Sequence, residues 1–117
     1  MRTIGVHHVS INIDDIDAAL DFYVGTLGLV VRTDRPDFGF GGAWLDAGSQ
    51  QVHLIGAPPP LDRGQHFALQ VEDLDATIVD LRENGVQISD AIPVGTGRQA
   101  FTHDPAGNMI ELHQVAT

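Results

Sequence analysis

The chain has 117 residues, of which 43% are hydrophobic and 19% charged, proportions typical of a globular protein. Its formal net charge of −10 argues against binding to nucleic acid or to an anionic membrane surface, because both require a basic footprint. The sequence contains no cysteine, no apolar run long enough to span a membrane and no signal-peptide pattern at its N-terminus. We therefore expect a cytoplasmic protein without disulfides or thiolate chemistry.

The first half of the chain is predicted to form one strand, one helix and three further strands. Residues 8–13 alternate between polar and apolar side chains, as a half-buried strand does. Asp14 and Asp15 then offer an N-cap for a helix over 16–27, which glycines end. The apolar stripe of this helix consists of Ile16, Ala19, Leu20 and Tyr23. Strand-like pieces separated by glycine follow at 29–34, 42–48 and 50–56.

The second half is predicted to repeat this order of elements. A strand over 66–71 precedes a helix over 74–85, which Asp73 caps and Gly85 ends. The inward-facing residues of this helix are Leu74, Ile78 and Leu81. Strand-like pieces follow at 86–92, 98–104 and 108–114. Each half therefore reads β-α-β-β-β.

The two halves are too small to bury a sufficient core separately, so we expect them to form one α+β domain over residues 1–117. The first module covers about 1–56 and the second about 66–117. Three consecutive prolines stiffen the linker between them, at about 57–65.

A repeated phrase relates the two modules. The stretch that begins at His8 reads HVSINIDDIDA, and the stretch that begins at His66 reads HFALQVEDLDA. These histidines are 58 positions apart (66 − 8), and the same offset maps His53 onto Glu111. Duplication of one module is the simplest explanation.

Strand alternation places four potential metal ligands on equivalent faces of the two modules. The spacing from His8 to His53 equals that from His66 to Glu111, 45 positions (53 − 8 and 111 − 66). Because side chains alternate along a strand, the apolar neighbours face the helices and the four donors face the opposite side. Imidazole and carboxylate together are typical ligands of Zn, Ni, Fe, Mn or Co. The sequence therefore predicts a site for one divalent ion, its identity left open.

Four stretches resemble the vicinal oxygen chelate superfamily, which includes glyoxalase I, bleomycin- and fosfomycin-resistance proteins, methylmalonyl-CoA epimerase and extradiol dioxygenases. They read HHVSINIDDIDAALDFYVGTLGL, GAWLDAGSQQVHLI, QHFALQVEDLDATIVDLRENGV and FTHDPAGNMIEL. The resemblance implies paired βαβββ modules that form a curled mixed sheet around a metal and substrate cleft. It places the family's ligand positions on His8, His53, His66 and Glu111.

His53 is the position at which this sequence departs from several family members. Glyoxalase I has a carboxylate in the last strand of both modules, whereas this chain has one only at Glu111. Epimerases place a glutamine at the position of His53. Extradiol dioxygenases use two histidines and one glutamate, a set that His8, His66 and Glu111 could supply, but those enzymes are much longer. Antibiotic-binding members lack the ligands.

Further residues are predicted to take part in catalysis or substrate binding. The candidate groups for proton transfer are Glu111 and either His53 or His113, with His53 preferred. Arg98 offers a cation for an anionic substrate, and His113 shares the strand parity of Glu111. The predicted substrate contacts are Arg98, Trp44, Phe101 and His113.

The leading hypothesis is a glyoxalase-like, metal-dependent lyase or isomerase that acts on a small oxygenated substrate. The metal would stabilise an enediolate or oxyanion as a Lewis acid. An extradiol-type Fe(II) dioxygenase and a metal-free drug- or metabolite-binding protein of the bleomycin-resistance type are the alternatives. We expect a homodimer, because the edges of a curled sheet need to be covered, and no nucleic-acid or membrane partner.

Overall fold

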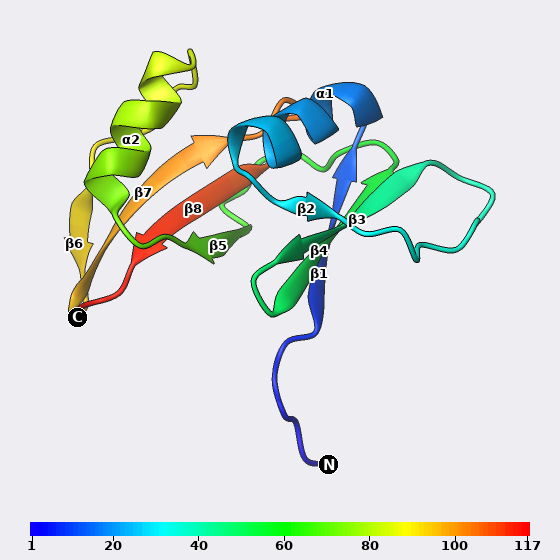
Figure 1. Ribbon diagram of the computed structural model, residues 1–117, viewed down its shortest axis with the longest axis horizontal. Coiled ribbons are helices and arrows are strands. Elements are labelled where there is room, and N and C mark those ends of the chain that lie inside the picture. The colour runs from blue at the N-terminus through cyan, green and yellow to red at the C-terminus, as the bar shows by residue number, and fades with distance from the viewer. The chain divides into compact units, whose positions relative to one another are not determined.

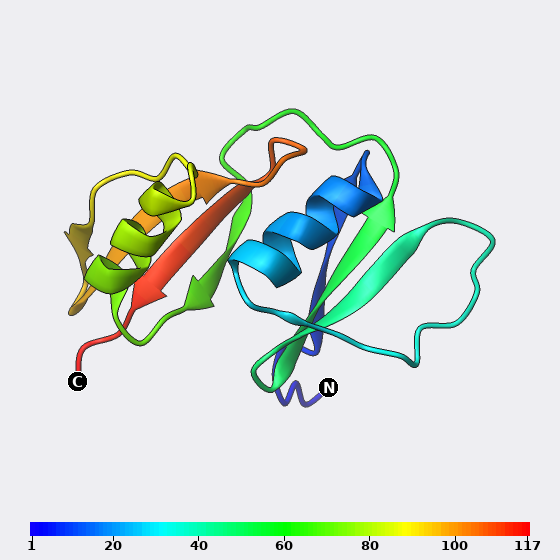
Figure 2. The same ribbon diagram turned by 45° about the horizontal axis from the view of Figure 1, so that its top comes forward.

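The computed structural model describes residues 1–117, which divide into two compact units, Met1–Pro60 and Leu61–Thr117. Each unit contains a four-stranded mixed sheet and one helical segment (Figure 1). Figure 2 shows each helical segment lying over one face of the sheet of its own unit. The predicted α+β class and the βαβββ modules are therefore confirmed. None of the helices has the length and hydropathy of a membrane span.

The first unit has the strand order β1-β4-β3-β2, with β1 parallel to β4 and the other neighbours antiparallel. Its strands are β1 (His8–Ile13), β2 (Val30–Val31), β3 (Gly42–Ala47) and β4 (Gln50–Gly56). The helix α1 (Ile16–Leu20) continues directly into a π-helical segment, η1 (Asp21–Thr26).

The second unit has the equivalent strand order β5-β8-β7-β6, again with one parallel pair, β5 and β8. Its strands are β5 (His66–Gln70), β6 (Ile92–Val94), β7 (Gly97–His103) and β8 (Met109–Gln114). Its helix α2 (Leu74–Glu83) packs against β7 and β8 and buries Leu74, Ile78 and Leu81, the three residues predicted to face inward.

The register of the parallel strand pairs is the same in both units. In the first unit Ser10 lies opposite His53, and in the second Ala68 lies opposite Glu111. Each of these pairs is related to the other by the offset of 58 found in the sequence (68 − 10 and 111 − 53). The duplication inferred from the sequence therefore extends to the hydrogen-bonding register.

The core of each unit lies between its sheet and its helix. Val52 and Leu54 of β4 are 2% and 1% exposed, and Ile110 and Leu112 of β8 are 0% and 1% exposed. These residues alternate with His53 and Glu111, so the buried faces of β4 and β8 fix the direction of the donor side chains.

The helical segment of the first unit differs from the continuous α-helix predicted over 16–27. From Asp21 onward it is π-helical, and the amide of Leu27 donates to the carbonyl of Phe22, five residues earlier. A π-turn is wider than an α-turn and brings neighbouring residues nearer to one face. Phe22 and Tyr23 are consequently both buried, although the helical stripe predicted only Tyr23.

The strand-like piece predicted at 86–92 is also misplaced, because β6 begins only at Ile92. Side chains occupy the backbone groups that a longer strand would pair. The hydroxyl of Thr102 donates to the carbonyl of Gln87, and the guanidinium of Arg82 donates to the carbonyl of Ile88. Only an isolated bridge joins Ile88 to Thr102.

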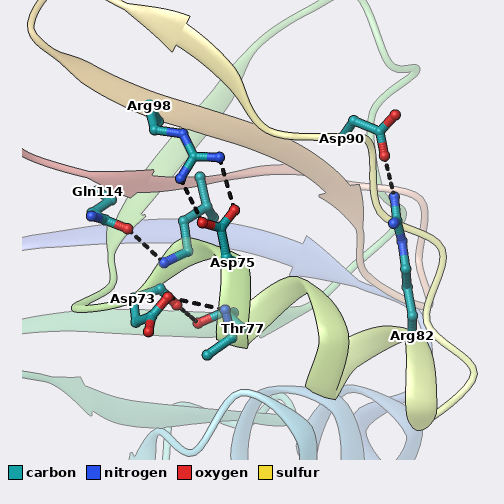
Figure 3. Close-up of polar contacts among 9 residues, drawn as sticks. Asp73, Asp75, Thr77, Arg82, Asp90, Arg98 and Gln114 are labelled. Carbon is teal, nitrogen blue, oxygen red and sulfur yellow. Dashed lines mark hydrogen bonds and ion pairs between the residues drawn. The ribbon is translucent and has the colours of Figure 1, made fainter.

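Both α-helices begin at the aspartate cap that the sequence predicts. In the second unit the Asp73 carboxylate accepts from the amide of Ala76 at 3.0 Å, and the Thr77 hydroxyl donates to the Asp73 carbonyl at 2.7 Å (Figure 3). Asp15 accepts from the amide of Ala18 in the equivalent way. These bonds satisfy amide groups that have no partner within the helix.

We predict that Asp73→Ala lowers the free energy of unfolding by about 1 kcal/mol, because it removes this cap. Glu72→Ala, which removes the same charge from the neighbouring exposed position, is the matched control and should have a much smaller effect. Urea denaturation of both variants measures the difference. Equal losses would show that charge, and not the cap, accounts for the change.

Candidate functional site

The structure brings the four predicted donors together as two pairs, one in each unit. His8 and His53 form the pair in the first unit, and His66 and Glu111 form the pair in the second. All four lie on the sheet face opposite the apolar residues that the helices cover. Across the structure, no group of three or more such side chains is arranged to hold a metal ion.

The pair in the second unit joins an imidazole nitrogen to a carboxylate oxygen. His66 Nε2 lies 3.2 Å from Glu111 Oε1, and His66 Nδ1 lies 2.8 Å from the carbonyl oxygen of Gly64. Both ring nitrogens therefore face oxygen acceptors, although a neutral imidazole carries only one N–H. The pair accordingly accommodates one further positive charge, either a second proton or a metal cation.

The geometry of this pair fits adjacent ligands of one metal ion. Two donors bonded at about 2.1 Å with an angle of about 90–109° at the metal lie roughly 3.0–3.4 Å apart. The 3.2 Å between His66 Nε2 and Glu111 Oε1 falls in that range. In addition, the carbonyl of Gly64 holds the other ring nitrogen, an arrangement that orients histidine ligands in metalloproteins.

His113 extends the pair on the far side of the carboxylate. Its Nδ1 lies 2.9 Å from Glu111 Oε2, so the two oxygens of Glu111 contact different histidines. The side chain of Glu111 is only 12% exposed, which strengthens both contacts. His113 was predicted to contact substrate, and the structure places it in direct contact with a predicted metal ligand.

Hydrogen bonding shifts the protonation of His66. The bond to the Gly64 carbonyl is the largest effect and raises the pKa of His66, burial opposes it, and the bond to Glu111 and the negative charge of that carboxylate raise the pKa further. In the metal-free protein, this imidazole therefore keeps its second proton to a higher pH than an unperturbed histidine does.

The pair in the first unit is arranged differently, as a stack of rings. The centroids of His8 and His53 are 3.9 Å apart with an interplanar angle of 15°, and Trp44 stacks on His53 at 4.5 Å and 11°. Because an imidazole lone pair lies in the plane of its ring, two parallel rings do not aim their lone pairs at one point. Shared ligation therefore requires one ring to leave the stack.

Hydrogen bonds hold both histidines of this stack. His53 Nε2 lies 2.8 Å from Gln51 Oε1, and His8 Nδ1 lies 2.8 Å from His7 Nδ1. Burial and then the charge of His8 lower the pKa of His53. His53 is thus held neutral near pH 7, the form that coordinates a metal.

The other predicted site residues fall into two groups. Trp44 of β3 lies opposite His53, and Phe101 of β7 lies opposite Glu111 in the equivalent place. The Phe101 ring meets the His66 ring edge-on, with their centroids 5.3 Å apart. Arg98, in contrast, shares the strand parity of the buried Ala100 and forms a two-bond ion pair with Asp75 of α2 (Figure 3). The structure does not bring Arg98 together with His66 and Glu111.

Two contacts of the site were not anticipated from the sequence. Gln51 has the same strand parity as His53, and this signal could have identified it. The carbonyl of Gly64 carries no side-chain signal, because its role depends only on the path of the backbone before β5.

Comparison with known proteins agrees with this architecture. The model of the glyoxalase/bleomycin resistance protein/dioxygenase superfamily matches residues 5–112. The chain belongs to this superfamily. Among its relatives, a probable lactoylglutathione lyase of Synechocystis is 31% identical over 94% of this chain and 95% of its own length.

Solved structures of the superfamily superpose over nearly the whole chain. An antibiotic binding protein from a Streptomyces species has a TM-score of 0.83 at 30% identity, with 99% of each chain covered. A glyoxalase family protein from Bacillus anthracis has a TM-score of 0.88, covering 99% of this chain and 100% of its own; its 24% identity supports the fold alone. Relatives of this superfamily member thus include proteins named as enzymes and as binding proteins.

We predict that the pKa values of His66 and His53 lie on opposite sides of 6.5 in the metal-free protein, His66 above and His53 below. Glu111→Gln should lower the pKa of His66 and leave that of His53 unchanged, because it removes a negative charge only from the second pair. NMR titration of the imidazole resonances measures both values. Indistinguishable pKa values would contradict the described hydrogen bonding.

Proposed function

We propose that this protein is a metal-dependent, glyoxalase-like lyase or isomerase that acts on a small oxygenated substrate. The observation that carries the proposal is the pair formed by His66 and Glu111, whose donor atoms accommodate one further positive charge and have the spacing of adjacent metal ligands. His8 and His53 occupy the equivalent positions of the duplicated module and supply two further nitrogen donors.

One divalent ion, Zn, Ni, Fe, Mn or Co, would be held by His8, His53, His66 and Glu111. When bound, it would supply a Lewis acid that polarises oxygens of the substrate. The residues of the chain have separate tasks: Glu111 and His53 exchange a proton with the substrate carbon, and His113 holds the carboxylate of Glu111. The net charge of −10 favours uptake of a cation.

The names of several relatives support this class of reaction. They include the probable lactoylglutathione lyase of Synechocystis and, at 25% identity over 94% of this chain, human methylmalonyl-CoA epimerase. The first name is that of a lyase and the second that of an epimerase, which is an isomerase, so the two names cover the two reaction classes of the proposal. We infer the same reaction type for this chain, without assigning either substrate to it.

A metal-free binding protein is the second candidate. The stacked rings of Trp44, His53 and His8 favour it, because they present ring faces instead of convergent lone pairs. The similarity to the antibiotic binding protein from Streptomyces points the same way. The distinguishing property is metal retention, which the enzyme needs and this second candidate lacks.

We also infer that the protein is a homodimer. The short edge strands β2 and β6 expose apolar side chains, with Val30 61%, Val31 46% and Ile92 51% exposed. Unpaired edges of this kind are usually covered in stable proteins. The cytoplasmic location stays a prediction from composition.

Metal retention should depend on the second pair more than on the first. We predict that His66→Ala and Glu111→Ala abolish retention of Zn or Ni, whereas His53→Ala weakens it, because its ring must first leave a stack. His103→Asn is the matched control, since this histidine pairs with Asp62 at the surface. Elemental analysis after gel filtration measures bound metal. A wild-type protein that retains none after loading would contradict the enzyme and favour the binding protein.

His113 should act as a positioning residue for Glu111. We predict that His113→Asn lowers metal affinity by about 10–100-fold, because the carboxylate loses the contact that orients it. The unfolding midpoint of the metal-free variant should change little, as His113 is partly exposed. Isothermal titration with Zn measures the affinity. An unchanged affinity would show that His113 does not position the ligand.

The reaction class is tested by proton exchange. In deuterated buffer, the metal-loaded protein should exchange the proton next to the carbonyl in members of a panel of 2-oxo and 2-hydroxy compounds, as seen by NMR. Glu111→Gln should lower the rate by about 10²–10⁴-fold, and His103→Asn should not. Consumption of oxygen with catechols, in place of exchange, would indicate a dioxygenase.

A further inference from the structure

A continuous series of aromatic rings extends from the first donor pair to an exposed loop. We call this set the ring series; its members are Phe40, Phe38, Trp44, His53 and His8. Neighbouring rings are 5.6 Å apart between Phe40 and Phe38, and 6.1 Å between Phe38 and Trp44. The remaining steps, from Trp44 through His53 to His8, are the 4.5 Å and 3.9 Å stacks of the donor pair. The series therefore belongs to the same site.

The loop end of the ring series leaves large apolar rings in contact with water. Phe38 is 49% exposed and Phe40 50% exposed, although they stack on each other at an interplanar angle of 18°. The loop is shaped by local bonds, in which the Asp37 carboxylate accepts from the amide of Gly39 and the Arg35 guanidinium donates to the carbonyl of Phe40. The two rings are thus held in an ordered loop with their apolar surface available.

A cation accompanies these rings. The guanidinium carbon of Arg35 lies 5.1 Å from the centroid of Phe38 and 5.6 Å from that of Phe40. These are the distances of cation–π contacts. In this position the charged group is held beside the ring faces.

Arg35 differs from its neighbour Arg32 in having no carboxylate partner. Arg32 forms ion pairs with Asp34 and Asp46, both at 2.8 Å, whereas no ion pair includes Arg35. In a chain with a net charge of −10, an unneutralised arginine beside a candidate site is available to an anion on a ligand.

We propose that the ring series binds the aromatic ring of a small-molecule ligand that carries a carboxylate or similar anionic group, with Arg35 pairing with that group. Phe38, Phe40 and Trp44 offer ring faces on which a planar ring stacks, and an aliphatic ring of equal size lacks that contact. The inference rests on the proposed function where it names a substrate class for that enzyme. Binding of the aromatic ring itself does not require the metal.

The ring series contains its own reporter, because Trp44 is the sole tryptophan of the chain. In the metal-free full-length protein, benzoate should change Trp44 fluorescence in a saturable manner. Cyclohexanecarboxylate, which keeps the charge, and benzyl alcohol, which keeps the ring, should each bind at least about tenfold more weakly. Equal affinities for benzoate and cyclohexanecarboxylate would overturn the aromatic part of the inference.

Two variants locate the binding. Arg35→Gln should weaken benzoate by about tenfold and leave benzyl alcohol unchanged; Arg2→Gln, an exposed arginine of the same unit, is the matched control. Phe38→Leu keeps an apolar side chain but removes a ring, and should weaken both ring-bearing probes. If Arg35→Gln and Arg2→Gln bind benzoate with the same affinity, Arg35 does not recognise the anion and the inference fails.

Measuring metal retention on the same samples separates this inference from the proposed function. Benzoate binding without metal retention would contradict the proposed enzyme and support the inference. Metal retention without benzoate binding would support the proposed enzyme and overturn the inference. Light scattering tests a different occupant of the exposed rings. If Phe38→Leu converts a dimer to a monomer and leaves the benzoate titration unchanged, a second copy of the chain covers the rings and the inference is overturned.

Discussion

The parallel pairing of the first and last strands within each module is the constraint on which the rest of the structure depends. It sets Ser10 opposite His53 and Ala68 opposite Glu111. The histidine that begins each first strand lies two positions before that serine or alanine, and therefore on the same face as the donor of the last strand. A slip of one residue would turn each last-strand donor toward the helix and an apolar residue toward the site. Burial of the apolar faces thus also enforces the orientation of the donors.

The same register carries different chemistry in the two units. Glu111 is held between two histidines, one of which is also bonded to a backbone carbonyl, so this half is charged and oriented before any ligand arrives. His53 lies instead in a stack of rings with His8 and Trp44. We interpret the second unit as the anchor for a metal and the first as the half that adapts when metal and substrate bind, with the stacked rings contributing ligand selectivity.

Most of the fold followed from the sequence because it depends on patterns of period two and on the repeated spacing. The departures arise where tertiary contacts decide local structure. The turn around Phe22 widens to bury two adjacent aromatic rings, and Thr102 displaces a strand by bonding a backbone carbonyl. At the site, strand parity predicted the sheet face on which the donors lie, and the parity that Arg98 shares with the buried Ala100 is a signal that Arg98 faces the helix. The pairing of Arg98 with Asp75 and the contact of His113 with Glu111 depend on side-chain conformation, which strand parity does not specify.

The central claim is that two equivalent donor pairs, one from each module, hold a single divalent ion. Anomalous diffraction from crystals of the Zn-loaded protein, measured on both sides of the zinc absorption edge, tests it most directly. One ion per chain is predicted, with His66 Nε2, Glu111 Oε1 and nitrogens of two histidines from the equivalent module at roughly 2.0–2.2 Å. An ion bound to only one pair, two ions per chain, or no ion at any of these side chains would contradict the claim.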